Sequence, residues 1–296
     1  MKNARKTRFD AIFDVAVTVI CLLCMLVVLY PLYFCVIASI SDPTAIANGR
    51  VILAPRDITW SGYKFLFMDS RIFTGYKNTI VYALGSTVLG LLLTIPAGYA
   101  LSRPDLAGRK WILKYYVFTM YFSGGMIPTY ILVRNIGLID YRVTVILMGS
   151  FAVYNLLVTR TFFANTLPIE LWEAAEIDGC SNGRYFIEVV VPLSSAIIAV
   201  IALYYCVAQW NDYMTSLIYL NTQSKYSLQM FLREILLAGQ NVAAETTDPE
   251  ELLEANRTAQ TIKYAVIIVA TVPMMVLYPF LQRFFVKGVM LGAIKG

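Results

Sequence analysis

The chain has 296 residues, of which 58% are hydrophobic and 15% are charged. Soluble domains typically have about 25% charged residues, so this composition excludes an ordinary soluble domain and indicates a membrane protein. Histidine is absent, which removes the commonest metal ligand and the usual general base near neutral pH, and we therefore expect no metal site. The net charge of +5 is typical of membrane orientation rather than of nucleic-acid binding.

Six apolar runs, each of about 20 residues or more, predict helices that cross a bilayer. They cover residues 11–40, 79–100, 111–133, 144–163, 193–213 and 264–285. The first run is longer than a bilayer needs, so we expect it to tilt or to extend beyond the lipid. The third is interrupted by SGGMIP at residues 123–128, which predicts either the edge of a cavity or a kink packed against a neighbouring helix.

Lysine and arginine gather in alternate connections, and short connections rich in these residues mark the cytoplasmic side. They gather in the N-terminal tail, in the second connection and near the C-terminus: Lys2, Arg5, Lys6, Arg8, Arg103, Arg109, Lys110, Arg283, Lys287 and Lys295. We therefore predict both termini in the cytoplasm. The expected organisation is a tail at 1–10, a first span with its outer loop at 11–70, a five-span core at 71–286 and a second tail at 287–296.

The same orientation places the segment 166–192 in the cytoplasm and the long loop 214–262 outside. Residues 228–238 of the outer loop have the pattern of a short amphipathic helix. An acidic patch follows: Glu245, Asp248, Glu250, Glu251 and Glu254. It is either a solvated face or a docking surface for an external partner.

The cytoplasmic segment, LPIELWEAAEIDGCSNGRYFIEVVVPL at residues 167–193, predicts two short helices joined by a sharp turn. We expect the first over 166–179, with Thr166 as its cap and Pro168 in its first turn. Gly179 can take the left-handed conformation that stops a helix. Ser181 is expected to cap the second helix, which Pro192 closes before the fifth span.

The first of these helices has the shape of a docking element. Leu171, Ala174, Ala175 and Asp178 share one side by their helical spacing, and the two alanines allow close approach of another chain. Such a helix fits a groove on a second protein, where Glu173 would offer a carboxylate to an arginine. The alternative is an interfacial helix with a solvated acidic side, which suits an anionic lipid surface poorly.

This segment resembles the EAA loop of the membrane subunits of ATP-binding-cassette importers. That loop reads E-A-A, three residues, G, nine residues and I-x-L-P; the counterparts here are Glu173-Ala174-Ala175, Gly179 and Val189-x-Val191-Pro192. LPIEL at 167–171, IDG at 177–179, WND at 210–212 and the ending QRFFVKGVMLGAIKG look like carbohydrate importers of the maltose-permease type. SGGMIPTYILVRNIGLID at 123–140 looks like their oligosaccharide branch, and the resemblance extends over roughly residues 71–296.

The resemblance implies an all-α membrane protein with the type I ABC importer fold: six transmembrane helices and a cytoplasmic coupling helix. It implies a multi-pass permease subunit of a bacterial cell membrane, not an enzyme, that forms the path for an oligosaccharide. The implied partners are a homologous permease subunit, a cytoplasmic ATPase dimer, an extracytoplasmic solute-binding protein, membrane lipid and the sugar substrate. The chain has no G-x-x-x-x-G-K-[ST], so it lacks that phosphate cradle; we expect no cofactor, with ATP bound by partner subunits.

The resemblance also implies roles for individual residues. Glu173 would pair with a basic residue of the ATPase, the alanines would pack in its cleft, and the loop 214–262 would reach the binding protein. The implied coupling residues are Glu170, Glu173, Ala174, Ala175, Asp178 and Gly179. The implied tail residues that contact the ATPase are Ile294, Lys295 and Gly296.

An oligosaccharide needs a polar-lined route, because stripping a hydroxyl of water costs about 4–8 kcal/mol on a hydrocarbon scale. The candidate lining residues are Asn78, Thr79, Tyr82, Asn155, Gln209, Asn211 and Asp212. Each of them has the alternative role of a hydrogen bond between helices. The scarcity of charge within the spans favours a neutral or weakly charged solute, and it leaves a uronate-bearing oligosaccharide or a non-sugar solute open.

Two other classes of protein are compatible with six spans. A stand-alone secondary carrier would need ionisable relays or inverted repeats, and the sequence shows neither. A membrane enzyme, such as a lipid-linked sugar transferase, would need clustered acids at a membrane surface; the acids of the segment 166–192 have the spacing of a docking helix instead. The sequence therefore favours the importer subunit.

Overall fold

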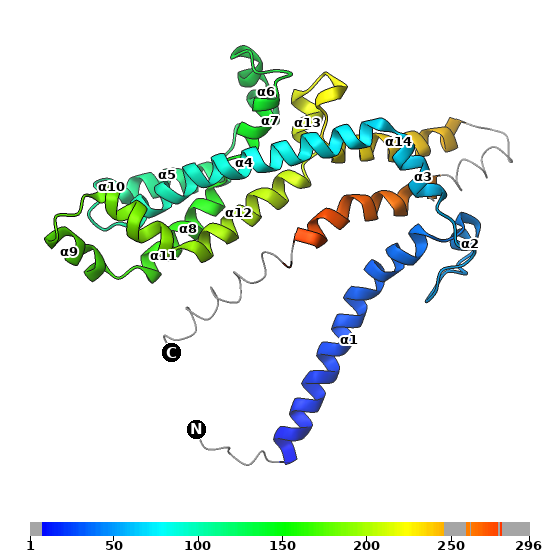
Figure 1. The fold of residues 1–296 in the computed structure, drawn as a ribbon, viewed down its shortest axis with the longest axis horizontal. Helices are drawn as coiled ribbons and strands as arrows, with labels where there is room; N and C mark the ends of the chain where they lie inside the picture. Colours follow the sequence, from blue (N-terminus) through cyan, green and yellow to red (C-terminus); the bar gives the residue numbers. More distant parts are fainter. Residues whose placement is uncertain (1–7, 246–258, 261, 278, 280–296) are drawn as a thin grey trace. The chain divides into compact units, whose positions relative to one another are not determined.

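The computed structural model describes residues 8–245, 259–260, 262–277 and 279, and these residues form helices and no strand (Figure 1). The chain divides into two compact units. The first comprises residues 1–69 with 234–271, and the second comprises residues 70–233 with 272–296. The predicted tail residues Ile294, Lys295 and Gly296 lie outside the described residues.

The first unit contains α1 (Arg8–Ser39), α2 (Pro43–Ala47) and α3 (Ser61–Met68). The apolar helix α1 is about 48 Å long at 1.5 Å per residue, longer than the roughly 30 Å hydrocarbon core, as the sequence predicts. A small buried cluster at its end joins Ile37 to Ala45 and Val51, and Asp42 caps α2 by accepting from Thr44 N at 2.8 Å.

The second unit is built around α4 (Ser70–Ser102), which packs against α7 (Arg142–Gly149), α8 (Val153–Thr166) and α12 (Ser195–Trp210) (Figure 1). Two glycines allow α4 to pack closely against α8 and against α12. A methyl group on Gly98 would lie 2.6 Å from Thr159 Cγ2 of α8, and one on Gly90 would lie 2.8 Å from the Tyr205 ring of α12.

Buried polar groups join the same helices. The Ser86 hydroxyl donates to Gln209 Oε1 at 3.2 Å, and the hydroxyls of Thr94 and Tyr205 lie 2.6 Å apart. In a membrane protein such groups must find partners within the chain. Both pairs therefore hold α12 against α4.

Two of the predicted runs, 111–133 and 144–163, are bent, and a third bend lies at the start of the run 193–213. Helices α5 (Arg109–Tyr121) and α6 (Met126–Asn135) meet at 109°, α7 and α8 meet at 45°, and the helix Asn182–Leu193 meets α12 at 80°. The break between α5 and α6 falls at the SGGMIP stretch, where Gly125 has φ +83°. A bend this large is a broken helix rather than a kink in a continuous one, so the predicted interruption is confirmed.

By length and composition, two of the described helices, Ile12–Ser39 and Ser70–Ser102, are long enough to cross a membrane, and up to five spans result if each bent pair counts as one. The shorter apolar helix Ile262–Leu277 coincides with the sixth run. All six runs contain helices where they are described, with breaks at 122–125 and 150–152, and the count of six spans stays a prediction.

The remaining helices lie between these elements. They are α9 (Ile169–Ile177), α10 (Asn182–Tyr185), the π-helical turn η1 (Phe186–Val190), α11 (Val191–Leu193), α13 (Met214–Tyr219), η2 (Gln223–Lys225) and α14 (Leu228–Glu245). The amphipathic helix predicted at 228–238 is present and is longer than expected. The acidic patch that begins at Glu245 lies outside the described residues, apart from the backbone of Glu245 itself.

Replacing Gly98 by alanine is expected to destabilise the second unit by roughly 1–3 kcal/mol, because overpacking forces α4 and α8 apart. The measurement is the Tm of the detergent-solubilised protein. The matched control is Gly183→Ala, since a methyl group on Gly183 of α10 meets no atom within 4 Å. Equal Tm values for the two variants would contradict the close α4–α8 packing.

Candidate functional site

Helix α9 begins directly after Pro168. Proline disfavours the helical conformation of the residue before it, and Leu167 is extended, with φ −98° and ψ 106°. Helix α8 therefore ends at Thr166, and Pro168 takes the position before α9. The prediction that Thr166 caps the first cytoplasmic helix is wrong for this reason, since Thr166 is the last residue of α8.

The turn after α9 agrees with the sequence. Asp178 is exposed at the end of the helix, and Gly179 has φ +73°, a conformation that suits glycine. Ser181 Oγ accepts from Arg184 N at 3.4 Å and so caps α10. The predictions of a left-handed stop at Gly179 and a cap at Ser181 are confirmed.

The exposed side of α9 carries Glu170, Glu173, Ala174 and Ile177, whose spacing puts them on one face. Ile177 is 87% exposed, and sequence reasoning did not include it among the site residues, although its spacing from Glu173 was visible. The prediction that both alanines share one surface is not met. Ala174 is exposed, whereas Ala175 packs against a buried cluster of the second unit.

That cluster holds α9 onto the helical bundle. Its buried members come from the ends of α4 and α8 and from the helix after the turn: Ile95, Tyr99, Phe163, Tyr185 and Val190. Trp172 packs against it, with its ring in an edge contact with Tyr185 at 5.2 Å between centroids. Trp172 and Ala175 therefore form the inner face of α9.

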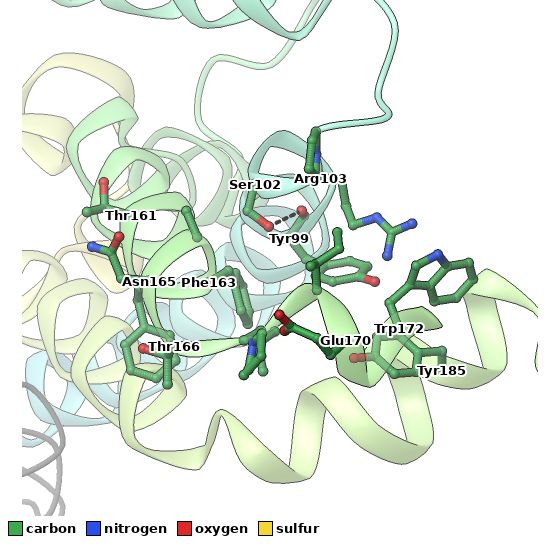
Figure 2. Close-up of a pocket in the computed structure, with 16 residues that line it drawn as sticks. Tyr99, Ser102, Arg103, Thr161, Phe163, Asn165, Thr166, Glu170, Trp172 and Tyr185 are labelled. Atoms are coloured by element: carbon green, nitrogen blue, oxygen red, sulfur yellow. Dashed lines mark hydrogen bonds between the residues drawn. The ribbon is translucent and has the colours of Figure 1, made fainter. Parts of the chain in front are cut away.

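Arg103, directly after α4, contacts the same tryptophan. Figure 2 shows Arg103 and Trp172 facing each other, and the guanidinium carbon lies 4.2 Å from the ring centroid. Arg103 also donates from Nε and Nη2 to the two oxygens of Asp105, each at 2.9 Å. These hydrogen bonds from Arg103 hold the pKa of Asp105 below its usual range.

A cavity of about 1100 Å³ lies beside this contact. It is lined by the end of α8, by the connection 167–168 and by the first residues of α9, together with Tyr99 and Arg103 (Figure 2). The first turn of α9 therefore borders this cavity rather than a layer of packed side chains.

Three candidate path residues lie together on α4 and hold a loop. Asn78 Nδ2 donates to the carbonyl oxygens of Ser224 and Tyr226, both at 2.9 Å. Tyr82 donates to Lys225 O at 2.6 Å, and Thr79 Oγ1 accepts from Leu228 N at 2.8 Å. All three side chains are buried, and their polar groups fasten the segment 224–228; their role in a path stays a prediction.

The other candidates lie elsewhere in the second unit. Asn155 of α8 and Gln209 of α12 are buried, and Gln209 bonds to Ser86 as described above. Asn211 is exposed and donates to Val207 O. Asp212 accepts from Thr215 N at the start of α13. None of the seven residues lines the cavity described above, and their role in a path stays a prediction.

Asp140, which sequence reasoning missed, joins two connections of the second unit. Its carboxylate accepts from the backbone N–H groups of Asn221 and Thr222, from the Thr222 hydroxyl at 2.6 Å and from Lys225 Nζ at 2.7 Å. Hydrogen bonds from Lys225 and then from Thr222 hold the pKa of Asp140 well below its usual range. Its φ of +62° is a conformation in which Asp and Asn are enriched.

Within the described part of the chain, no group of three or more Cys, Asp or Glu side chains is placed to hold a metal ion.

Comparison with known proteins gives consistent matches. The family described as "Binding-protein-dependent transport system inner membrane component" matches residues 95–291. A polygalacturonan/rhamnogalacturonan transport system permease protein, YtcP of Bacillus subtilis (strain 168), is 35% identical over 97% of this chain and 99% of the relative. The maltodextrin transport system permease protein MdxG of the same organism is 29% identical over 92% of each chain.

One solved structure has the same fold. A chain in the crystal structure of a bacterial ABC transporter involved in the import of the acidic polysaccharide alginate aligns with a TM-score of 0.80 and 30% sequence identity. The alignment covers 96% of this chain and 100% of that chain. The helical architecture described above is therefore that of an importer permease.

Replacing Asp140 by asparagine is expected to raise hydrogen exchange at the Asn221 and Thr222 amides about tenfold at pH 7, because a neutral acceptor replaces a charged one. Folding lowers the pKa of this carboxylate, so the carboxylate stabilises the folded state at any pH above its ordinary pKa. This stabilisation is lost as the pH falls from the ordinary pKa through the lowered pKa of the folded state. The difference between the two proteins should therefore shrink on acidification below about pH 4.

The matched control is Asp57→Asn, which changes an exposed aspartate that also has a positive φ, +49°. Unchanged exchange at residues 221–222 in the Asp140 variant would show that the carboxylate does not hold this loop.

Proposed function

The chain belongs to the family of inner membrane components of binding-protein-dependent transport systems, and on that basis we propose that it is the permease subunit of an oligosaccharide importer driven by a partner ATPase. The observation that carries the proposal is helix α9. It presents Glu170, Glu173, Ala174 and Ile177 outward while Trp172 and Ala175 anchor it to the bundle. A short helix with an anchored inner face and a free outer face is suited to fill a groove on another protein.

The ATPase dimer would bind the outer face of α9. Ala174 leaves room for close approach, Ile177 adds an apolar contact, and Glu173 offers a charge-assisted hydrogen bond to a basic residue of the cleft. Glu170 and Asp178 flank this contact, and Gly179 sets the turn that presents it. Ile294, Lys295 and Gly296 are proposed to contact the same ATPase. ATP binds the partner in this proposal, since the chain lacks the Walker phosphate cradle.

The membrane path would be shared with a homologous permease subunit. A polar lining lets sugar hydroxyls exchange water for protein partners, and Asn155, Gln209 and Asn211 remain our candidates for it. We propose a bacterial cell membrane, with both termini and α9 on the cytoplasmic side, because of the distribution of lysine and arginine. The solute-binding protein would then meet the outer loop 214–262.

The solute class we propose is uronate-bearing oligosaccharides. YtcP is named for polygalacturonan and rhamnogalacturonan, and the neighbouring structure for alginate.

Glu173→Lys and Ala174→Trp are each expected to reduce co-purification of the ATPase by at least about tenfold, through an unpaired buried charge or a steric clash in the cleft. The measurement is the amount of ATPase recovered with the tagged permease after co-expression. Glu176→Lys is the matched control, because it makes the same charge change on the flank of α9. Full recovery of ATPase with both variants would refute docking through this face.

The solute proposal predicts that oligogalacturonate is imported faster than maltodextrin by the complete complex in vesicles with ATP inside. The measurement is uptake of each labelled sugar in the presence of its binding protein. Flux through the purified chain alone, without the ATPase, would contradict the importer mechanism. Preferential uptake of maltodextrin would contradict only the solute class.

A further inference from the structure

The first half of α9 is attached to the bundle mainly through one side chain. Ile169, Glu170, Leu171 and Glu173 are exposed, and the start of the helix borders the cavity of about 1100 Å³. Trp172 is the residue of this half that packs against the buried cluster. Within α9, Trp172 and Ala175 are therefore the side chains that contact this cluster, while Leu167 and Cys180 contact it just outside the two ends of the helix.

At the end of α4, the Arg103 side chain contacts the Trp172 ring. Its side chain is 12% exposed, and Asp105 holds both Nε and Nη2 at 2.9 Å. A guanidinium fixed by a bidentate carboxylate keeps its plane and position. At 4.2 Å from the ring centroid it contributes a cation–π contact.

Helix α4 is well placed to pass on a displacement. It packs along its length against α7, α8 and α12, and its buried residues Asn78, Thr79 and Tyr82 hold the segment 224–228. The cavity beside α9 leaves space for the helix to tilt without first displacing packed side chains. A tilt of α9 about Trp172 would displace Arg103, which directly follows the last residue of α4.

We propose that Asp105, Arg103 and Trp172 form a clasp that positions α9 on α4 and transmits the movement of the ATPase to the bundle. In this role Arg103 and Trp172 are positioning residues, because they act through α9 and touch neither solute nor ATP. The inference rests on the proposed function, since it requires that a partner ATPase moves α9.

The test uses the complete importer complex in liposomes: this chain with its partner permease, its ATPase and its binding protein. Trp172→Leu removes the ring, Trp172→Phe retains an aromatic face, and Arg103→Lys retains the charge but loses the planar fork. Three quantities are measured: ATPase recovered with the permease, basal ATP hydrolysis, and stimulation of hydrolysis by loaded binding protein. The loading sugar is whichever of oligogalacturonate and maltodextrin stimulates the wild-type complex more.

Trp172→Leu and Arg103→Lys should retain the ATPase and its basal rate while stimulation falls by about fivefold, the factor that a partly buried cation–π contact contributes to an equilibrium. Trp172→Phe should restore most of the stimulation. The matched control is Trp111→Leu, which removes an exposed ring that also carries a cation, with Lys114 Nζ at 4.7 Å from its centroid, but which lies on α5 and not on α9.

The clasp is overturned if stimulation of ATP hydrolysis is unchanged in Trp172→Leu and Arg103→Lys, or if Trp111→Leu lowers the stimulation equally. It is also overturned if Trp172→Leu and Arg103→Lys lose the ATPase, because that loss would assign these two residues a purely structural role. A wild-type complex without any stimulation would overturn the proposed function as well, and this outcome is visible before any variant is compared.

Discussion

Helix α4 can contact three neighbours at once because its contact points with α8 and α12 are glycines. A methyl group on Gly98 or Gly90 would lie within 3 Å of Thr159 or Tyr205, so larger residues would hold the helices apart. At this short separation Ser86 and Thr94 of α4 form hydrogen bonds with Gln209 and Tyr205 of α12, and a lipid environment favours such internal partners. The packing and the polar pairing of the second unit therefore depend on the same close approach.

The two ends of α4 carry different attachments. Near its beginning, Asn78, Thr79 and Tyr82 hold the segment 224–228. After its last residue, Arg103 contacts Trp172 of α9. One helix of about 50 Å, at 1.5 Å per residue, thus connects a fastened loop to the helix that we propose as the ATPase contact. This arrangement gives a physical connection between the two ends of α4.

The two ion pairs described above lie in connections, whereas neutral polar groups join the long helices of the second unit. The clasp pairs Arg103 with Asp105 outside the span, and the Asp140–Lys225 pair likewise lies in connections rather than within a span. Ionic groups at these places remain partly solvated and avoid the desolvation that a bilayer centre would impose. Inside the described helices of the second unit, neutral groups such as Ser86, Thr94 and Gln209 join the helices instead.

The sequence by itself determined the membrane class, the order of the apolar runs, the interruption at 123–128 and the left-handed turn at Gly179. These features are local: they depend on hydrophobic length, on missing side chains and on the conformational limits of glycine and proline. Tertiary structure alone decided that Ala174 faces outward while Ala175 packs inward, and that Asn78, Thr79 and Tyr82 fasten a loop. It also brought Asp140 to residues 221–225 and Arg103 to Trp172. Such pairs lie tens of residues apart, and helical periodicity carries no information about which distant residue a face will meet.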